Sequence, residues 1–83
     1  MKWEKEYKKD IWHIEAGEIK ISIIRNHVMN PGFWTMHCHA MRMDTIDLKL
    51  PSDQPAELAQ VMAINVVRNK LKELSSALGK VGK

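Results

Sequence analysis

The residues best suited to chemistry in this chain are its histidines and its single cysteine, three of which are adjacent as His37, Cys38 and His39. Imidazole nitrogen and thiolate sulfur are the ligands that zinc prefers, and a structural zinc site uses several of them together. Alternate side chains of a strand point to opposite faces, so Cys38 should lie away from the two histidines. The metal candidates are then His13, His37 and His39, and we expect neither a metal nor another cofactor.

Nucleophilic and acid–base catalysis find little support in the same residues. A reactive cysteine needs a base within reach, and the neighbours of Cys38 project to the other face. The acidic pairs Asp44 with Asp47 and Glu15 with Glu18 stand near expected turns, where carboxylates commonly make local hydrogen bonds. The sequence contains no glycine-rich phosphate loop and no serine nucleophile elbow. We therefore expect no catalytic residues and a protein that is not an enzyme.

The elements that must position these residues are strands in the middle of the chain. Isoleucines alternate with polar residues over 19–23, which is the period of a strand with one buried face. A preceding run at 11–15 connects to it through Gly17, which permits the positive φ of a tight hairpin turn. Further strand patterns extend from 33 to 43 and from 45 to 50. These runs predict an antiparallel meander.

A long helix is predicted after the strands, over residues 53–79. Ser52 or Asp53 can cap it, and Pro55 is tolerated in a first turn. Apolar residues then recur at helical spacing until Gly79. At ~1.5 Å per residue the helix is roughly 35 Å long, about twice the length of a common strand, so the sheet should cover only part of it.

This order of elements predicts the α+β class. We expect an antiparallel three- to four-stranded meander packed on one long C-terminal helix (β-β-β-(β)-α). The 83 residues allow a single domain over 1–83, with a charged N-terminal arm at 1–10, the meander at 11–50 and the helix at 53–79.

Strand alternation separates a core face of the sheet from an outer face. The core should contain Trp12, Ile21, Ile23, Trp34, Cys38, Ala63, Val67, Leu71 and Leu74, with Met36 and Ala40 also facing the helix. The outer face should carry His13, Lys20, Ser22, Thr35, His37 and His39. A chain this short has no second layer to cover that face, so the outer face should meet solvent or a partner.

Surplus apolar residues predict a surface for binding another protein. Some widen the apolar face in the first half of the helix, and others follow the outer-face alternation of the third strand, where methionine offers an adaptable contact. The first set is Leu58, Val61 and Met62, and the second is Phe33, Met41 and Met43. We expect a homodimer, or an accessory protein that binds another protein, through one of these two surfaces.

The charge distribution favours an alternative function, nucleic-acid binding. The net charge is +3, and residues 68–83 hold five cations against Glu73 alone. Cations are common at helix C-termini, where the macrodipole favours them, but a basic end also attracts nucleic acid. In outline, strands followed by a basic helix end are similar to small three-stranded DNA-binding domains and to small antitoxin-like domains, without a matching motif. Binding would use the open sheet face and the helix end, through Lys20, Arg42, Arg68, Lys70 and Lys72.

The expected compartment is the cytoplasm. No apolar run approaches the ~18–20 residues of a membrane span, and the first ten residues lack the apolar stretch of a secretory signal. The lone Cys38 has no partner for an internal disulfide and fits a reducing environment. We expect no membrane partner.

Overall fold

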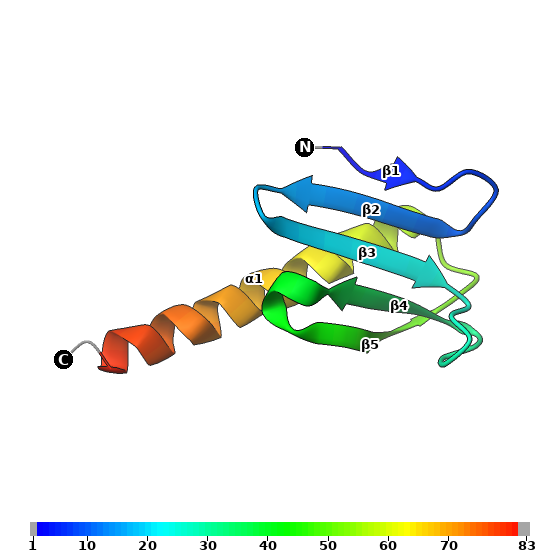
Figure 1. Ribbon diagram of the computed structural model, residues 1–83. Helices are drawn as coiled ribbons and strands as arrows, with labels where there is room; N and C mark the ends of the chain where they lie inside the picture. Colours follow the sequence, from blue (N-terminus) through cyan, green and yellow to red (C-terminus); the bar gives the residue numbers. More distant parts are fainter. Residues whose placement is uncertain (1, 82–83) are drawn as a thin grey trace.

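The computed structural model describes the backbone of residues 2–81 and the side chains of residues 2–79. Five antiparallel strands form one sheet in chain order, and one helix follows them (Figure 1). The elements are β1 (Glu4–Lys5), β2 (Ile11–Ala16), β3 (Ile19–Arg25), β4 (Phe33–Cys38), the 3-10 turn η1 (His39–Met41), β5 (Met43–Pro51) and α1 (Ala56–Val81). The predicted α+β class is confirmed, and the sheet has more strands than expected because the N-terminal arm contributes β1.

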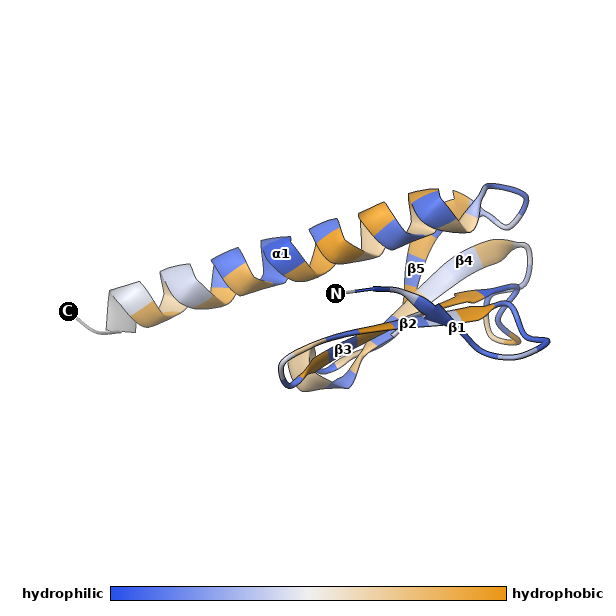
Figure 2. Ribbon diagram, turned by 90° about the horizontal axis from the view of Figure 1, so that it is seen from above, coloured by the Kyte–Doolittle hydropathy of each residue, from blue (hydrophilic) through white to orange (hydrophobic). Residues whose placement is uncertain are grey.

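Helix α1 crosses one face of the sheet and then continues past the β2–β3 hairpin (Figures 1 and 2). Its buried residues are small, namely Ala56, Ala59, Ala63 and Val67, which allows the helix to approach the strands closely. The predictions for Ala63 and Val67 are confirmed. Those for Leu71 and Leu74 are wrong: these side chains are 43% and 44% exposed, because the helix diverges from the sheet here (Figure 2).

The aromatic end of the core lies near the start of α1. Trp34 is fully buried, and its Nε1 donates a hydrogen bond to the carbonyl oxygen of Gln54 at 3.1 Å, which ties β4 to the turn before the helix. The rings of Trp34 and Trp12 are 5.4 Å apart. The guanidinium of Arg25 lies 4.7 Å from the Trp34 ring, a cation–π distance. Ile21, Ile23 and Cys38 are buried as predicted, whereas Trp12 is only partly buried.

The third predicted strand is shorter than its sequence pattern. It ends at Cys38, and η1 follows, with Arg42 in the left-handed region at φ 56°. This reversal turns Met41 and Met43 toward the core, where both are partly buried, and leaves Ala40 exposed. The prediction that Met41 and Met43 lie on the outer face is therefore wrong. The alternating pattern in the sequence continues beyond Cys38, although the strand itself ends there and the turn η1 follows.

Strand β5 follows its predicted pattern but is irregular. Leu48 and Leu50 are buried on the core face, as expected from their alternation. Thr45 and Lys49 adopt positive φ values of 51° and 56°, which side chains rarely accept. At the second of these positions, Asp47 Oδ1 accepts a 2.7 Å hydrogen bond from the backbone N–H of Lys49. The backbone of this edge strand is therefore bent.

The loop between β3 and β4 covers part of the outer face. Thr35 was expected on the open face but is fully buried. Asn30 Nδ2 donates to Thr35 Oγ1 at 3.2 Å and to Asp47 Oδ1 at 3.0 Å, so this loop side chain bridges β4 and β5. Asn26 Oδ1 holds the loop by accepting from the backbone N–H of Gly32 at 2.8 Å. The prediction of an entirely open outer face is wrong at this end.

Candidate functional site

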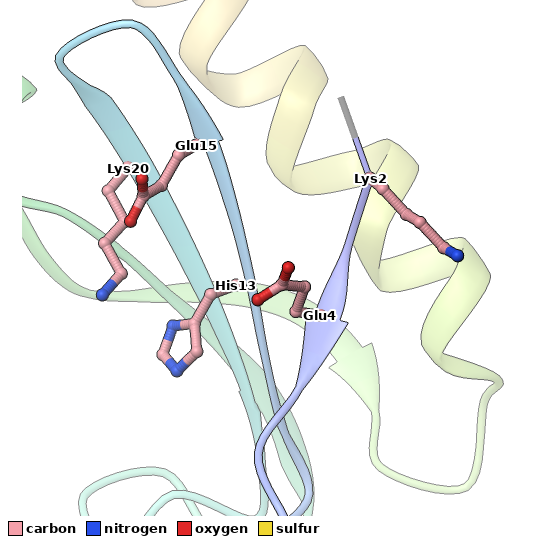
Figure 3. Close-up of a pocket in the computed structure, with 5 residues that line it drawn as sticks. All are labelled: Lys2, Glu4, His13, Glu15 and Lys20. Atoms are coloured by element: carbon pink, nitrogen blue, oxygen red, sulfur yellow. The ribbon is translucent and has the colours of Figure 1, made fainter.

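A polar row crosses the outer face of the sheet from strand to strand. Strand pairing places Glu4 opposite His13, His13 opposite Ser22, and Ser22 opposite His37. Figure 3 shows Glu4 and His13 on neighbouring strands, with Lys20 and Glu15 close together across the hairpin. The predicted outer-face positions of His13, Ser22 and His37 follow from this register.

Three members of this face have the residue types of a hydrolytic triad. His13 Nδ1 lies 2.7 Å from Ser22 Oγ, and His13 Nε2 lies 3.5 Å from Glu6 Oε1. Our sequence analysis missed this group, although the hairpin turn at Gly17 already places His13 opposite Ser22. Ser22 stands within β3, whose backbone is paired on both sides by β2 and β4, so its N–H groups are not available as an oxyanion hole. We assign this group no catalytic role.

The other histidines gather at the end of β4. His37 Nδ1 lies 2.7 Å from Asp44 Oδ1 and 3.1 Å from the backbone N of Thr45. The His37 ring is 5.4 Å from the His27 ring and 6.4 Å from the His39 ring, with the latter pair nearly parallel.

Metal binding finds no support in this arrangement. Residues 2–81 contain no group of three or more His, Cys, Asp or Glu side chains placed to hold a metal ion. Among the metal candidates, His13 bonds to Ser22 instead, His37 contacts Asp44, and His39 lies on η1 rather than on the strand. Cys38 is buried on the core face.

The basic residues of the nucleic-acid alternative are divided between the outer sheet face and the surroundings of α1. Lys20 lines a hollow of mixed charge together with Glu4, His13, Glu15 and Lys2, and Figure 3 shows Lys2 pointing away from the others. The other four candidates lie on or near α1. Arg42 and Lys70 share a hollow with Leu74, and Arg68 borders a second hollow. Lys70 Nζ is 3.9 Å from Glu73 Oε2, and Lys72 is exposed. The side chain of Lys80 and all of Lys83 lie outside the described residues.

An apolar groove opens where α1 diverges from the β2–β3 hairpin. It has a volume of about 210 Å³. Its lining is Ile14, Ala16, Ile19 and Ile21 from the hairpin and Ile64, Val67, Arg68 and Leu71 from the helix. Pockets for small-molecule ligands usually measure ~300–1,000 Å³, so the size of this groove suits inserted side chains better.

A leucine stripe continues from this groove along the projecting part of α1. Leu71, Leu74 and Leu78 are 43%, 44% and 71% exposed. Together with Ile64 and Val67 they are spaced alternately by three and four residues, which is the spacing of the contact seam in paired helices. Our sequence analysis treated this pattern as a core face, although the spacing is also that of a coiled coil.

The partner-binding residues predicted in the first half of α1 differ in how exposed they are. Leu58 and Val61 are 40% and 56% exposed, and Met62 is partly buried against the core. Phe33, from the proposed sheet surface, is 40% exposed. Three further exposed apolar residues, Leu71, Leu74 and Leu78, lie further along the helix than the predicted set.

No family model, curated protein or solved structure matches this chain. Within residues 2–81 no helix combines the length and the apolar character that a membrane crossing requires.

Proposed function

We propose that this protein is a non-enzymatic interaction module that works as a homodimer, with its contact along the C-terminal half of α1. The observation that carries the proposal is the exposed seam of Leu71, Leu74 and Leu78, which continues an apolar groove in the same molecule. Contiguous exposed apolar surface of this kind marks interaction sites on soluble proteins.

The energetics of an isolated helix support the same proposal. Beyond Val67, no helix residue with a described side chain is fully buried, so the last turns receive little packing from the sheet. Isolated helices shorter than ~12–15 residues are marginal in water. Complete burial of a leucine contributes roughly 1.5–3 kcal/mol relative to full exposure. A partner surface over the seam would therefore stabilise both the contact and the helix.

The proposal places the protein in the cytoplasm and assigns it no reaction. Support for a reducing compartment comes from Cys38, which is fully buried as a free thiol. We do not extend the proposal to nucleic acid, because Lys20 shares its hollow with Glu4 and Glu15 and Lys70 contacts Glu73.

The test is the molar mass in solution of the wild-type chain and two helix variants. Leu74→Glu places a charge on the seam, and Ser76→Glu places the same charge on an exposed position away from it. We expect light scattering at high micromolar concentration to give a dimer for the wild type and Ser76→Glu, and a monomer for Leu74→Glu. Met62→Glu is a poorer probe, because Met62 packs against the core.

Circular dichroism must show that Leu74→Glu keeps its sheet and helix. A wild-type monomer at this concentration would refute the proposal, as would a Leu74→Glu variant that remains fully dimeric.

A further inference from the structure

We infer that the imidazole of His37 is a pH-sensitive switch for a backbone bulge in β5. The neutral ring accepts a hydrogen bond from the backbone N–H of Thr45, whereas the charged ring donates one to the carboxylate of Asp44. The switch goes beyond the proposed homodimer and does not depend on it, because these groups lie on the outer face of the sheet, away from α1.

The bulge places two residues of β5 opposite a single residue of β4. The pairing of the two strands changes register between Met36 and Cys38. In this interval β4 has only His37, whereas β5 has both Asp44 and Thr45. Bulges of this kind bend a strand and re-aim its side chains. Both bulge residues therefore contact the same ring.

The two contacts at His37 Nδ1 require different states of that nitrogen. Asp44 Oδ1 lies 2.7 Å away, and a carboxylate oxygen can only accept, so Nδ1 must then carry a proton. The backbone N of Thr45 lies 3.1 Å away, and its N–H donates, so Nδ1 must then offer a lone pair. One nitrogen cannot do both, so gain or loss of the proton exchanges one bond for the other.

The surroundings determine which bond belongs to the neutral ring. The Asp44 side chain is 72% exposed, so it is free to turn toward water when the ring has no charge. The Thr45 N–H is fixed by the backbone and stays directed at the ring. The neutral ring should therefore carry its proton on Nε2 and accept from Thr45 at Nδ1.

The backbone conformation of Thr45 makes the loss of this bond consequential. Its φ is 51°, in the left-handed region, which a β-branched residue rarely adopts. Such strain persists only where the surrounding structure holds it. The bond to His37 is one of the contacts that hold this conformation, and a charge on the ring removes it.

Other charged and titratable groups share this face of the sheet with His37. Ser22, which pairs with His37 from β3, carries no charge. Asp44 contacts the ring nitrogen directly, and the rings of His27 and His39 lie 5.4 and 6.4 Å from the His37 ring. In order from β2 to β5, the charged and titratable groups are His13, Glu18, Lys20, His27, His39 and Asp44. The experiment must therefore assign the response to one histidine.

NMR of the nitrogen-15-labelled wild type from about pH 5 to pH 8, where histidine ordinarily changes charge, tests the switch. Ring nitrogen shifts of His37 report which nitrogens carry protons. Solvent exchange of the Thr45 amide, divided by the intrinsic rate at each pH, reports its hydrogen bond. As His37 becomes charged on acidification, we expect protection of the Thr45 amide to fall roughly 2- to 10-fold, the scale of one hydrogen bond.

Two variants act on the switch in different ways. His37→Gln cannot gain a charge, so the protection of the Thr45 amide should no longer change with pH. Asp44→Asn keeps the ring but removes the anion that favours its charged form, so the change at Thr45 should move to lower pH. If His37→Gln does not fold, by circular dichroism, the shift in Asp44→Asn provides the test.

Matched controls remove a charge or a ring elsewhere. Asp53→Asn neutralises an exposed acid at the opposite end of β5 and should leave the Thr45 response at the wild-type pH. His27→Gln removes the neighbouring ring, and the response should persist. The switch would be overturned by a neutral His37 ring that keeps its proton on Nδ1, or by a ring that does not change charge in this interval. A Thr45 amide that does not respond as His37 titrates, or that still responds in His37→Gln, would overturn it equally.

Discussion

The hydroxyl of Thr35 is a polar group buried beneath a loop. Its side chain is fully buried, and its hydrogen bond comes from Asn30 Nδ2, at 3.2 Å. A buried polar group without a partner costs more than the bond itself contributes, because its desolvation is then uncompensated. The hydrogen bond from the loop residue Asn30 therefore determines whether burial of the Thr35 hydroxyl stabilises or destabilises the fold.

The first prediction tests that dependence. Asn30→Ala should lower the free energy of unfolding by about 1–3 kcal/mol, because it leaves Thr35 Oγ1 without its donor. Thr35→Val in the Asn30→Ala background should restore part of the loss by removing the orphaned hydroxyl. Urea unfolding followed by tryptophan fluorescence measures both. Val28→Ala, at a loop side chain that is 85% exposed, is the control and should stay within about 0.5 kcal/mol. Equal effects of Thr35→Val in both backgrounds would contradict the coupling.

At the scale of the element, α1 is one helix with two environments. Its first half presents alanines to the sheet, and its second half presents leucines to solvent. The change occurs after Val67, where the helix passes the hairpin. Only the first half therefore contributes to the core of the single chain.

A truncation tests this division of the helix. A chain that ends at Leu74 should keep the sheet and the first half of α1, because no described side chain beyond this residue is buried. We expect its unfolding midpoint to lie within a few degrees of the monomeric Leu74→Glu variant, by circular dichroism. Loss of the sheet signal on truncation would show that the projecting half supports the fold.

Local patterns predicted the strands and the helix, because alternation and helical spacing are properties of neighbouring residues. Ile21, Ile23 and Trp34 are buried as alternation required. The turn at η1 was missed, since nothing in its composition interrupts the strand pattern before Arg42 takes positive φ.

The site was harder to predict than the fold. The burial of Thr35 depends on a loop that returns over the sheet, which only the three-dimensional structure reveals. The exposure of Leu71 and Leu74 depends on where the helix diverges from the sheet. The heptad spacing was visible in the sequence, but the same spacing describes a core face equally well.

As a whole, the molecule is an elongated body of 49 × 24 × 19 Å with the helix projecting from one end. A body of this shape exposes much surface for its volume. A partner on the exposed leucines of α1 would widen the molecule at its projecting end. The proposed association therefore alters shape as well as stability.

The bent backbone of β5 has a consequence for how copies of this protein can add to one another. Chains polymerise through sheets when an edge strand offers a straight row of free N–H and C=O groups, the route to cross-β fibrils. One edge of this sheet is β1, which has only two residues, and the other is β5, interrupted at Thr45 and Lys49 by left-handed backbone. Neither edge provides a continuous template for an incoming strand. Growth by strand addition is therefore disfavoured at both edges, even where the protein is concentrated.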